Sequence, residues 1–390
     1  MNKGKTLLAQ VMDFVPKYEF DKIVAKYHGN YKAQEFSCWE QYICMAFAQL
    51  TQRESLRDIE TCLRTVSNKL YHCGIKSKVA KSTLSYWNES RDWRIYAELT
   101  QQLIVTARKL YENDNDFLKE LDATVYAFDS TTIDLCLTLF PWAKFRTTKA
   151  AVKAHTLLDL QGNIPSWIFI TDGSVHDVNV LDLLPIEAGA YYIMDKGYID
   201  FERLFRIHQS AAFWITRAKE NFSYNRQYSR PVEKSLGIIC DQTGVLKREL
   251  AFKKYPEKIR RIKYYDNIKR ETFVFITNNN VLDATMIVLM YKQRWQIELF
   301  FKWIKQHLRI KSFFGTSRNA VYTQIWIAVG VYVLVAIIKK KLKSPHSLYT
   351  LLQKLSVCVF ERIPIHQAFQ EIEIQKSNEQ DDNQLSLFDL

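Results

Sequence analysis

Between residues 122 and 218 the chain carries five short apolar segments that can best be buried together as strands of one sheet. They lie at 124–131, 154–160, 165–171, 190–195 and 211–217. Each is rich in β-branched and aromatic residues and is bounded by Gly, Pro, Asn or Asp, which is typical of strands and their turns. The segment 199–209 has a helical pattern, so we predict an α/β layer whose central strands are nearly all apolar.

The first 115 residues show helical patterns instead. Apolar residues recur at helical spacing in 36–52, 55–74 and 81–111, and Ser37 and Ser55 are placed as N-caps. Several short helices in a basic setting are compatible with a DNA-binding domain. A plain helical cover over the next domain fits the composition equally well.

Residues 219–270 interrupt the apolar strand pattern. They contain fourteen Lys and Arg against six Asp and Glu, with tyrosines among them. Alternating patterns in 245–255 and 258–266 predict hairpins with one basic face. An apolar strand pattern resumes at 271–278, and two long helical patterns follow at 284–310 and 320–342.

The net charge of +12 is unevenly distributed along the chain. The last twenty residues hold six acids and one base, which leaves +17 on the first 370. A surplus of this size predicts a polyanionic partner, although charge alone does not separate nucleic acid from a membrane surface.

The cysteines and the apolar runs bear on where the protein works. The seven cysteines are scattered without a CxxC pair, which predicts reduced thiols in a cytosolic protein. The N-terminus has no pattern of a signal peptide. The apolar run 325–338 falls short of the roughly 18–20 residues that span a bilayer, so we predict a buried core helix in a soluble protein.

Three acidic residues stand out by their positions. Asp129 follows the apolar residues 125–128, Asp195 ends the segment 190–195, and Glu298 lies within a helical pattern. Acids at the carboxyl ends of neighbouring strands project into the crevice where α/β sheets place their sites. Clustered carboxylates repel one another unless cations neutralise them, and their oxygens favour Mg²⁺ or Mn²⁺. Two such ions support attack at phosphorus.

Glu298 belongs to a polar stripe at helical spacing, which is formed by Tyr291, Arg294, Glu298, Lys302 and Lys305. An acid among cations is normally a solvated ion-pair face. Here the apolar side chains of the same segment form a separate surface, so the polar stripe is free to meet a phosphate backbone. The apolar surface consists of Trp295, Ile297, Phe300, Phe301 and Ile304.

The spacing Y-x2-R-x3-E-x6-K, which Tyr291, Arg294, Glu298 and Lys305 meet, resembles the signature of DDE transposases of the IS-four family. The resemblance is strong over about 120–340. Three further segments that resemble the family are 153–181, 191–200 and 213–221.

The resemblance implies an RNase H-like catalytic core that is interrupted by a β-rich insertion and preceded by a helical N-terminal DNA-binding domain. The acidic triad falls on Asp129, Asp195 and Glu298, which would hold two Mg²⁺ ions, with Mn²⁺ able to substitute. Such enzymes bind the terminal inverted repeats of their element as a homodimer, cut both ends, usually form a hairpin, and join the ends to target DNA. The implied division is 1–115 for the N-terminal domain, 116–218 and 271–345 for the core, 219–270 for the insertion, 346–374 for a C-terminal helical region and 375–390 for a disordered acidic tail.

By the same resemblance, Tyr291, Arg294 and Lys305 would hold phosphates near the cleaved end, with Lys302 as an additional cation. In the family an aromatic residue of the insertion can receive a flipped base. Candidates for this residue are Phe273 first, and Tyr264 or Tyr265 as alternatives.

Two basic residues directly after the fifth apolar segment have two interpretations. Arg217 and Lys219 could hold DNA near the site, or they could be ordinary surface bases.

The acidic tail carries a separate motif. Gln384, Leu385, Ser386, Leu387 and Phe388 form QLSLF, which resembles the pentapeptide that docks bacterial proteins on the sliding clamp of DNA polymerase III. Apolar side chains on a disordered tail favour a partner. The alternative is a terminal strand or helix that packs on the body.

The sequence thus predicts a cytoplasmic, nucleoid-associated bacterial transposase. Two alternatives stay open: an RNase H-like nuclease without strand transfer, and a DNA-binding protein that has lost its catalytic centre.

Overall fold

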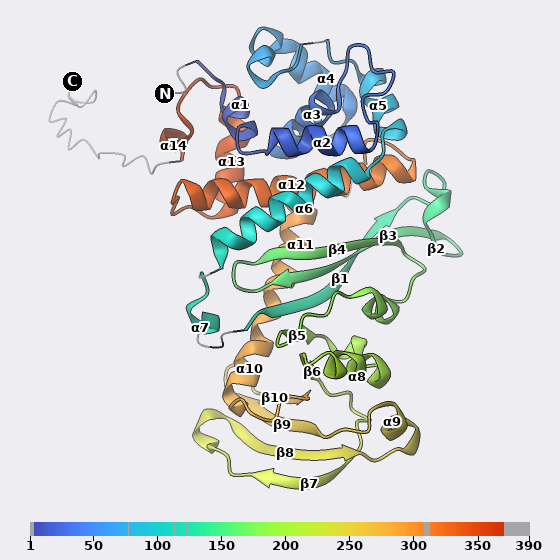
Figure 1. The fold of residues 1–390 in the computed structure, drawn as a ribbon, viewed down its shortest axis with the longest axis vertical. Coiled ribbons are helices and arrows are strands. Elements are labelled where there is room, and N and C mark those ends of the chain that lie inside the picture. Colours follow the sequence, from blue (N-terminus) through green and yellow to red (C-terminus); the bar gives the residue numbers. More distant parts are fainter. Residues whose placement is uncertain are drawn as a thin grey trace, which may run out of the picture.

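The computed structural model describes residues 4–76, 78–112, 114–119, 121, 123–307 and 313–369. In this part of the chain ten strands form one large mixed sheet, with helices above it (Figure 1). The strands are β1 (Val125–Leu135), β2 (Lys144–Arg146), β3 (Lys149–Asp159), β4 (Ile164–Asp172), β5 (Tyr191–Met194), β6 (Phe213–Arg217), β7 (Tyr224–Arg230), β8 (Ile238–Leu246), β9 (Ile259–Asp266) and β10 (Glu271–Thr277).

The strand order is β2-β3-β1-β5-β6-β10-β9-β8-β7, and β4 also pairs with β3. β5 runs parallel to both β1 and β6, while the remaining pairs are antiparallel. All five apolar segments predicted as strands are confirmed, as β1, β3, β4, β5 and β6, and so is the mixed α/β layer. β7 to β10 continue the same sheet beyond β6 as an antiparallel meander, so the basic segment is not a separate sheet.

Helices cover both faces of the sheet and form the upper part of the molecule (Figure 1). The α-helices are α1 (Leu7–Met12), α2 (Lys17–Lys26), α3 (Cys38–Leu50), α4 (Leu56–Thr65), α5 (Lys81–Ser90), α6 (Arg94–Tyr111), α7 (Asp116–Lys119), α8 (Phe201–Gln209), α9 (Glu249–Lys254), α10 (Ala284–Gln293), α11 (Trp295–His307), α12 (Arg318–Lys341), α13 (Leu348–Cys358) and α14 (Ile365–Ala368). Shorter 3₁₀ helices are η1 (Ser67–Cys73), η2 (Pro141–Ala143), η3 (Asp177–Leu183), η4 (Lys196–Tyr198) and η5 (Lys234–Leu236).

Local sequence signals explain where several helices begin. Ser37 and Glu40 form a reciprocal capping box at the start of α3, and the Ser55 hydroxyl accepts the Asp58 N–H at the start of α4. Asp200 caps α8 by accepting the N–H groups of the second and third helical residues. Both predicted serine caps are therefore confirmed.

α12 lies between the N-terminal helices and the sheet. Its residues 320–338 are all buried, because α12 packs against α3, α5, α6 and α13. The hydroxyls of Tyr322 and Tyr332 donate to the carbonyls of Ile170 and Asn163 at the β4 edge, at 3.4 and 3.0 Å. α12 is long and apolar enough to cross a membrane, but its apolar stretch is wholly buried within the protein, which confirms the predicted core helix.

The long helical pattern at 284–310 is divided, because a tight turn at Arg294 separates α10 from α11. The Arg294 N–H bonds to the Tyr291 carbonyl, and the Ile297 N–H bonds to the Arg294 carbonyl, both with the three-residue spacing of a 3₁₀ turn. The prediction of one continuous helix across this segment was therefore wrong, although Tyr291, Arg294 and Glu298 remain neighbours across the turn.

The contact between α6 and α12 depends on a residue without a side chain. A Cβ atom at Gly330 would lie 2.8 Å from Oγ1 of Thr100, which itself donates a hydrogen bond to the Trp326 carbonyl at 3.0 Å. We expect Gly330→Leu to lower the free energy of unfolding by about 1–3 kcal/mol through overpacking, as measured by urea denaturation.

A double variant provides the control. Thr100→Ala removes the atom that a new Cβ would meet, so Gly330→Leu with Thr100→Ala should cost less than the sum of the two single changes. Additive effects would show that this contact does not limit the helix spacing.

Candidate active site

Asp129 and Asp195 lie side by side because their strands are paired in register. Phe128 of β1 pairs with Met194 of β5, so the next residue of each strand is an aspartate. Parallel strands lie about 4.8 Å apart, and alternate residues share a face. Both carboxylates therefore lie on the face that α11 covers. β1 does not end at Asp129, as the sequence suggested, but continues to Leu135 in pairing with β3.

Arg294 connects the strands to the third acid. Its Nη1 atom lies 3.3 Å from Oδ2 of Asp129, and its Nη2 atom lies 2.5 Å from Oε1 of Glu298. A second arginine, Arg217 at the end of β6, places its Nη2 atom 3.1 Å from Oδ1 of Asp195. The structure thus brings the three predicted acids together around two guanidinium groups.

The two aspartates differ in electrostatic environment. Burial raises the pKa of Asp129 to about 6, which the Ser130 N–H and Arg294 only partly oppose, while Asp195 and Glu298 add repulsion. Burial acts in the same direction on Asp195, but the hydrogen bond from Arg217 and the Lys196 N–H outweigh it and lower its pKa. Asp129 is therefore the carboxylate for which added positive charge would be most favourable.

The signature residues divide into buried and exposed groups. Tyr291 is 8% exposed, and its ring centroid lies 6.0 Å from the Arg217 guanidinium and 5.9 Å from that of Arg294. On α11, by contrast, Lys302 is exposed and Lys305 is half-buried. Tyr291 and Arg294 thus lie inside the site, whereas the two lysines continue along α11.

The predicted apolar surface of α11 is correct except at one position. Ile297, Phe300, Phe301 and Ile304 are buried, but the side chain of Trp295 is 57% exposed. Trp295 is the first residue of α11 and directly follows the turn at Arg294, where the helical periodicity used for the prediction is interrupted.

A cavity of about 500 Å³ lies beside Asp195, between the core strands and β9–β10. Four basic and two acidic side chains line it, together with Phe273. The basic residues are Lys196, Arg217, Lys219 and Arg261. Arg217 and Lys219 were predicted from the sequence, whereas Lys196 and Arg261 were missed. The position of Lys196 directly after Asp195 and the basic face predicted for 258–266 were the available signals.

The three candidate base acceptors occupy different surroundings. Phe273 lies with its ring 6.0 Å from the Arg217 guanidinium and borders the cavity. The hydroxyl of Tyr264 accepts a hydrogen bond from Lys292 at 3.1 Å, and Tyr265 is 38% exposed. Of the three, Phe273 is the one that lines the cavity beside Asp195.

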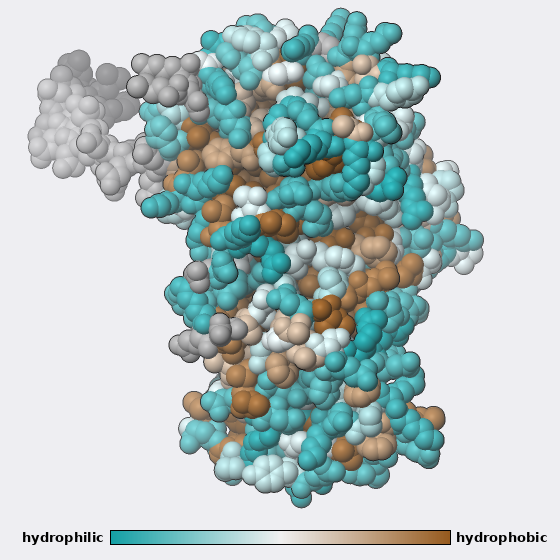
Figure 2. Space-filling model, viewed as in Figure 1, coloured by the Kyte–Doolittle hydropathy of each residue, from teal (hydrophilic) through white to brown (hydrophobic). Residues whose placement is uncertain are grey.

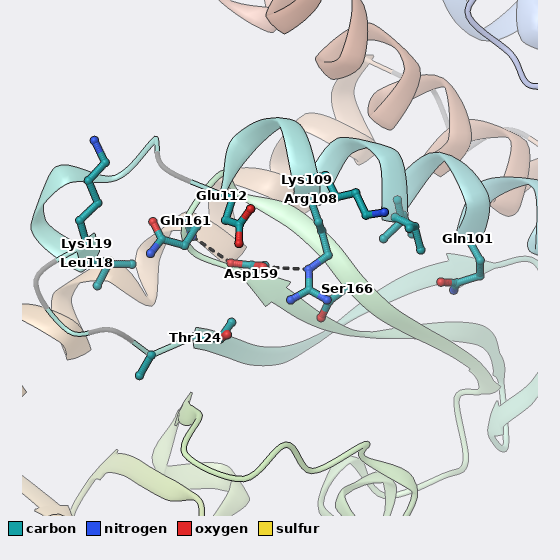
Figure 3. A pocket seen from close by; sticks show the side chains of 13 residues that line it. Gln101, Arg108, Lys109, Glu112, Leu118, Lys119, Thr124, Asp159, Gln161 and Ser166 are labelled. Carbon is teal, nitrogen blue, oxygen red and sulfur yellow. Dashed lines mark hydrogen bonds and ion pairs between the residues drawn. The ribbon is translucent and has the colours of Figure 1, made fainter.

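Another hollow, of about 530 Å³, lies between α6 and the amino end of β1, away from the three acids (Figure 3). Its central arginine, Arg108, donates to Asp159 at 2.9 Å and to the Tyr126 hydroxyl at 2.8 Å. These bonds attach α6 to the sheet, so we assign them to the fold.

The donor set of the acidic cluster fits a divalent cation, because the acids offer only oxygen donors, which Mg²⁺ prefers. Arg217 pairs with Asp195, and Arg294 is shared by Asp129 and Glu298. Among the described residues no group of three His, Cys, Asp or Glu side chains has the spacing of a metal site. The QLSLF motif at 384–388 lies outside the described residues.

The raised pKa of Asp129 leads to a pH test. Because the folded protein binds this proton more tightly than the unfolded chain, protonation of Asp129 favours folding. This contribution to the free energy of unfolding is fully present below about pH 4 and is lost as the pH rises through about 6. At pH 7–8 without divalent metal, Asp129→Asn should therefore be more stable than the parent, by up to about 3 kcal/mol.

The measurement is urea unfolding in EDTA between about pH 4 and 8. Asp134→Asn, which changes an exposed aspartate of the same strand, is the matched control and should follow the parent throughout. A constant difference between Asp129→Asn and the parent at every pH would contradict the assignment.

Comparison with known proteins identifies the family of the chain. Residues 120–334 match the family model "Transposase DDE domain", and residues 3–76 match a domain of unknown function, DUF4372. The protein y4zB of Sinorhizobium fredii, which carries a transposase name, is 33% identical over 64% of this chain and 70% of its own length.

Two further relatives are named as transposases of insertion sequence elements. That of IS5377 from Geobacillus stearothermophilus is 29% identical over 53% of this chain and 54% of its own. That of IS4SA from Synechocystis sp. is 22% identical over 82% and 88%. A piggyBac transposase in a synaptic complex with hairpin DNA covers 94% of this chain and 80% of its own, with a TM-score of 0.44 and 10% identity. The chain belongs to the DDE transposases, in agreement with its resemblance to the IS-four family, and is an enzyme that cleaves and transfers DNA.

Proposed function

We propose that this transposase cleaves the ends of the insertion sequence that encodes it and joins them to target DNA, with Asp129, Asp195 and Glu298 as the catalytic carboxylates. The observation that carries the proposal is the bridge from Arg294 to Asp129 and Glu298, with Asp195 in the next strand. In this proposal the parallel strands and their neighbours form an RNase H-like core, and β7 to β9 form most of the insertion.

The DDE domain implies a divalent metal ion, typically Mg²⁺, and we propose that the three carboxylates hold two such ions, with Mn²⁺ able to substitute. When bound, these ions would supply Lewis-acid activation of the attacking and leaving oxygens at phosphorus. Arg294 and Arg217, which pair with these carboxylates, would then offer their N–H groups to phosphate oxygens of the DNA. The buried ring of Tyr291 holds both guanidinium groups in place.

We propose that DNA follows the basic surfaces on either side of the site. Phosphates near the cleaved end would be contacted by Lys302 and Lys305 on α11 and by the basic residues that line the cavity beside Asp195. Phe273 is the favoured acceptor for a flipped base, because it borders that cavity.

The N-terminal helices are proposed to bind the terminal inverted repeats. This proposal is supported by exposed basic residues on and around α4 and α5, which are Arg57, Arg64, Lys76, Lys78 and Lys81. A homodimer on DNA, acting in the bacterial cytoplasm at the nucleoid, would bring both ends of the element together.

The catalytic assignment is tested with Asp129→Asn, Asp195→Asn and Glu298→Gln, which remove charge but preserve size. Each should reduce cleavage of DNA that carries the ends of the element, in Mg²⁺, by about 10³-fold or more, since the three groups act as a unit. DNA binding, measured by gel shift, should persist.

Asp134→Asn is the matched control and should cleave like the parent. Cleavage without joined products would favour a nuclease that lacks strand transfer. Binding without cleavage by the parent and every variant would favour a DNA-binding protein, and the triad would be abandoned.

We further propose that QLSLF at 384–388 docks the transposase on the bacterial sliding clamp. A peptide of residues 375–390 should bind the purified clamp in isothermal titration calorimetry. Replacing Leu387 and Phe388 with Ala should weaken binding more than 10-fold, because each buried apolar side chain contributes about 1.5–3 kcal/mol.

Ser386→Ala is the matched control and should bind nearly as well as the parent peptide, because it removes a hydroxyl and leaves both apolar side chains. Equal binding by the doubly substituted peptide would reject the motif.

A further inference from the structure

The turn between β9 and β10 exposes an isoleucine. Ile268 is 93% exposed, the highest value for a large apolar side chain among the described residues. Single exposed apolar side chains are common in folded proteins. Exposure alone therefore does not distinguish a binding residue from an ordinary surface residue, whereas the surroundings of Ile268 do.

The conformation of the turn that exposes Ile268 is fixed by the buried residue Asp266. The Asp266 carboxylate, in a residue that is 3% exposed, accepts the N–H groups of Ile268 at 3.0 Å and Lys269 at 3.1 Å. Asp266 also pairs with Nζ of Lys292 on α10 at 3.0 Å, which attaches the turn to the helix that precedes Arg294. These bonds use backbone groups at position 268, so the turn itself does not require an apolar side chain there.

Two cations on either side of one aromatic ring lead from the catalytic centre to this turn. Arg217 pairs with Asp195 at 3.1 Å and lies 6.0 Å from the Phe273 ring centroid. Nζ of Lys269 lies 5.9 Å from the same centroid, and Lys269 and Arg270 are both exposed beside Ile268. The turn is thus connected to the site by direct contacts.

The surface around the insertion is mostly hydrophilic and carries only scattered apolar side chains (Figure 2). An apolar side chain beside two basic residues suits duplex DNA, which is a polyanion with an apolar interior of stacked base pairs. Proteins that kink DNA insert Ile, Leu, Met, Phe or Pro between base pairs while cations hold the phosphates.

We propose that Ile268 is a wedge that inserts between two base pairs of the DNA bound at the active site, with Lys269 and Arg270 on the flanking phosphates. This inference rests on the proposed function, because it requires a DNA end near Asp195. Ile268 lies in the turn that precedes β10, and Phe273 lies within β10 at the cavity beside Asp195. The wedge would therefore act on base pairs near the cleaved end.

The test places 2-aminopurine, whose fluorescence rises when it unstacks, at successive positions along DNA that carries the ends of the element. Ca²⁺ replaces Mg²⁺ so that binding is observed without cleavage. The parent protein should raise fluorescence several-fold at one base-pair step near the cleaved end. Ile268→Ser should abolish the rise, whereas Ile268→Leu should retain it.

Val281→Ser is the matched control, because Val281 is 88% exposed, lies beyond the other end of β10 and should leave the signal unchanged. Lys269→Ala with Arg270→Ala should reduce the slope of log affinity against log salt by about 2, or about 1 for each lost phosphate contact.

The outcomes separate this inference from the proposed function. If the parent neither binds nor cleaves the ends of the element, the proposed function itself fails. If the parent binds and cleaves but Ile268→Ser gives the same fluorescence profile, the wedge is rejected and the function stands. If Ile268→Ser instead breaks up a protein dimer without altering the profile, Ile268 belongs to a protein interface and the wedge is also rejected.

Discussion

Repulsion between carboxylates on two adjacent interior strands of a largely apolar sheet is the constraint on which the rest of this structure depends. Asp129 and Asp195 become neighbours because β1 and β5 are paired in register, and α11 adds Glu298. Such a cluster is stable only with positive charge beside it, which Arg294 and Arg217 supply. The tight turn between α10 and α11 serves this arrangement, since it places Arg294 where one guanidinium reaches both Asp129 and Glu298.

Rigidity of the site comes from elements that carry none of its chemistry. α12 has no polar face and packs at once against the N-terminal helices, α13 and the edge of β4. At the other end, the sheet continues without a break from β6 into the basic meander. The surfaces proposed to bind DNA are thus connected to the acidic cluster by packed helices and paired strands, not by linkers.

Much of the fold could be predicted from the sequence because its signals are local. Apolar segments bounded by turn residues became strands, and Ser37 and Ser55 became caps. The two aspartates could be found because each directly follows apolar strand residues. Features that depend on tertiary contacts could not be read in this way. The turn at Arg294 arises inside a helical pattern, and Trp295, which directly follows it, is exposed although the rest of the predicted apolar surface is buried. Lys196 and Arg261 meet at one cavity only through strand pairing.

The hydrogen bonds between α1 and residues 359–363 have a consequence for synthesis on the ribosome. The Leu7 and Leu8 N–H groups bond to the carbonyls of Glu361 and Val359, and Gln10 bonds to Ile363, 353 residues away. At about 5–20 residues per second, the partner of α1 emerges roughly 18–70 s after α1 itself. A nascent chain therefore carries α1 without its C-terminal partner for nearly the whole of its translation, although the contact with η1 can form earlier. The apolar side chains Leu7, Leu8 and Val11, which are fully buried in the finished fold, are completely covered only after residues 359–363 have been made.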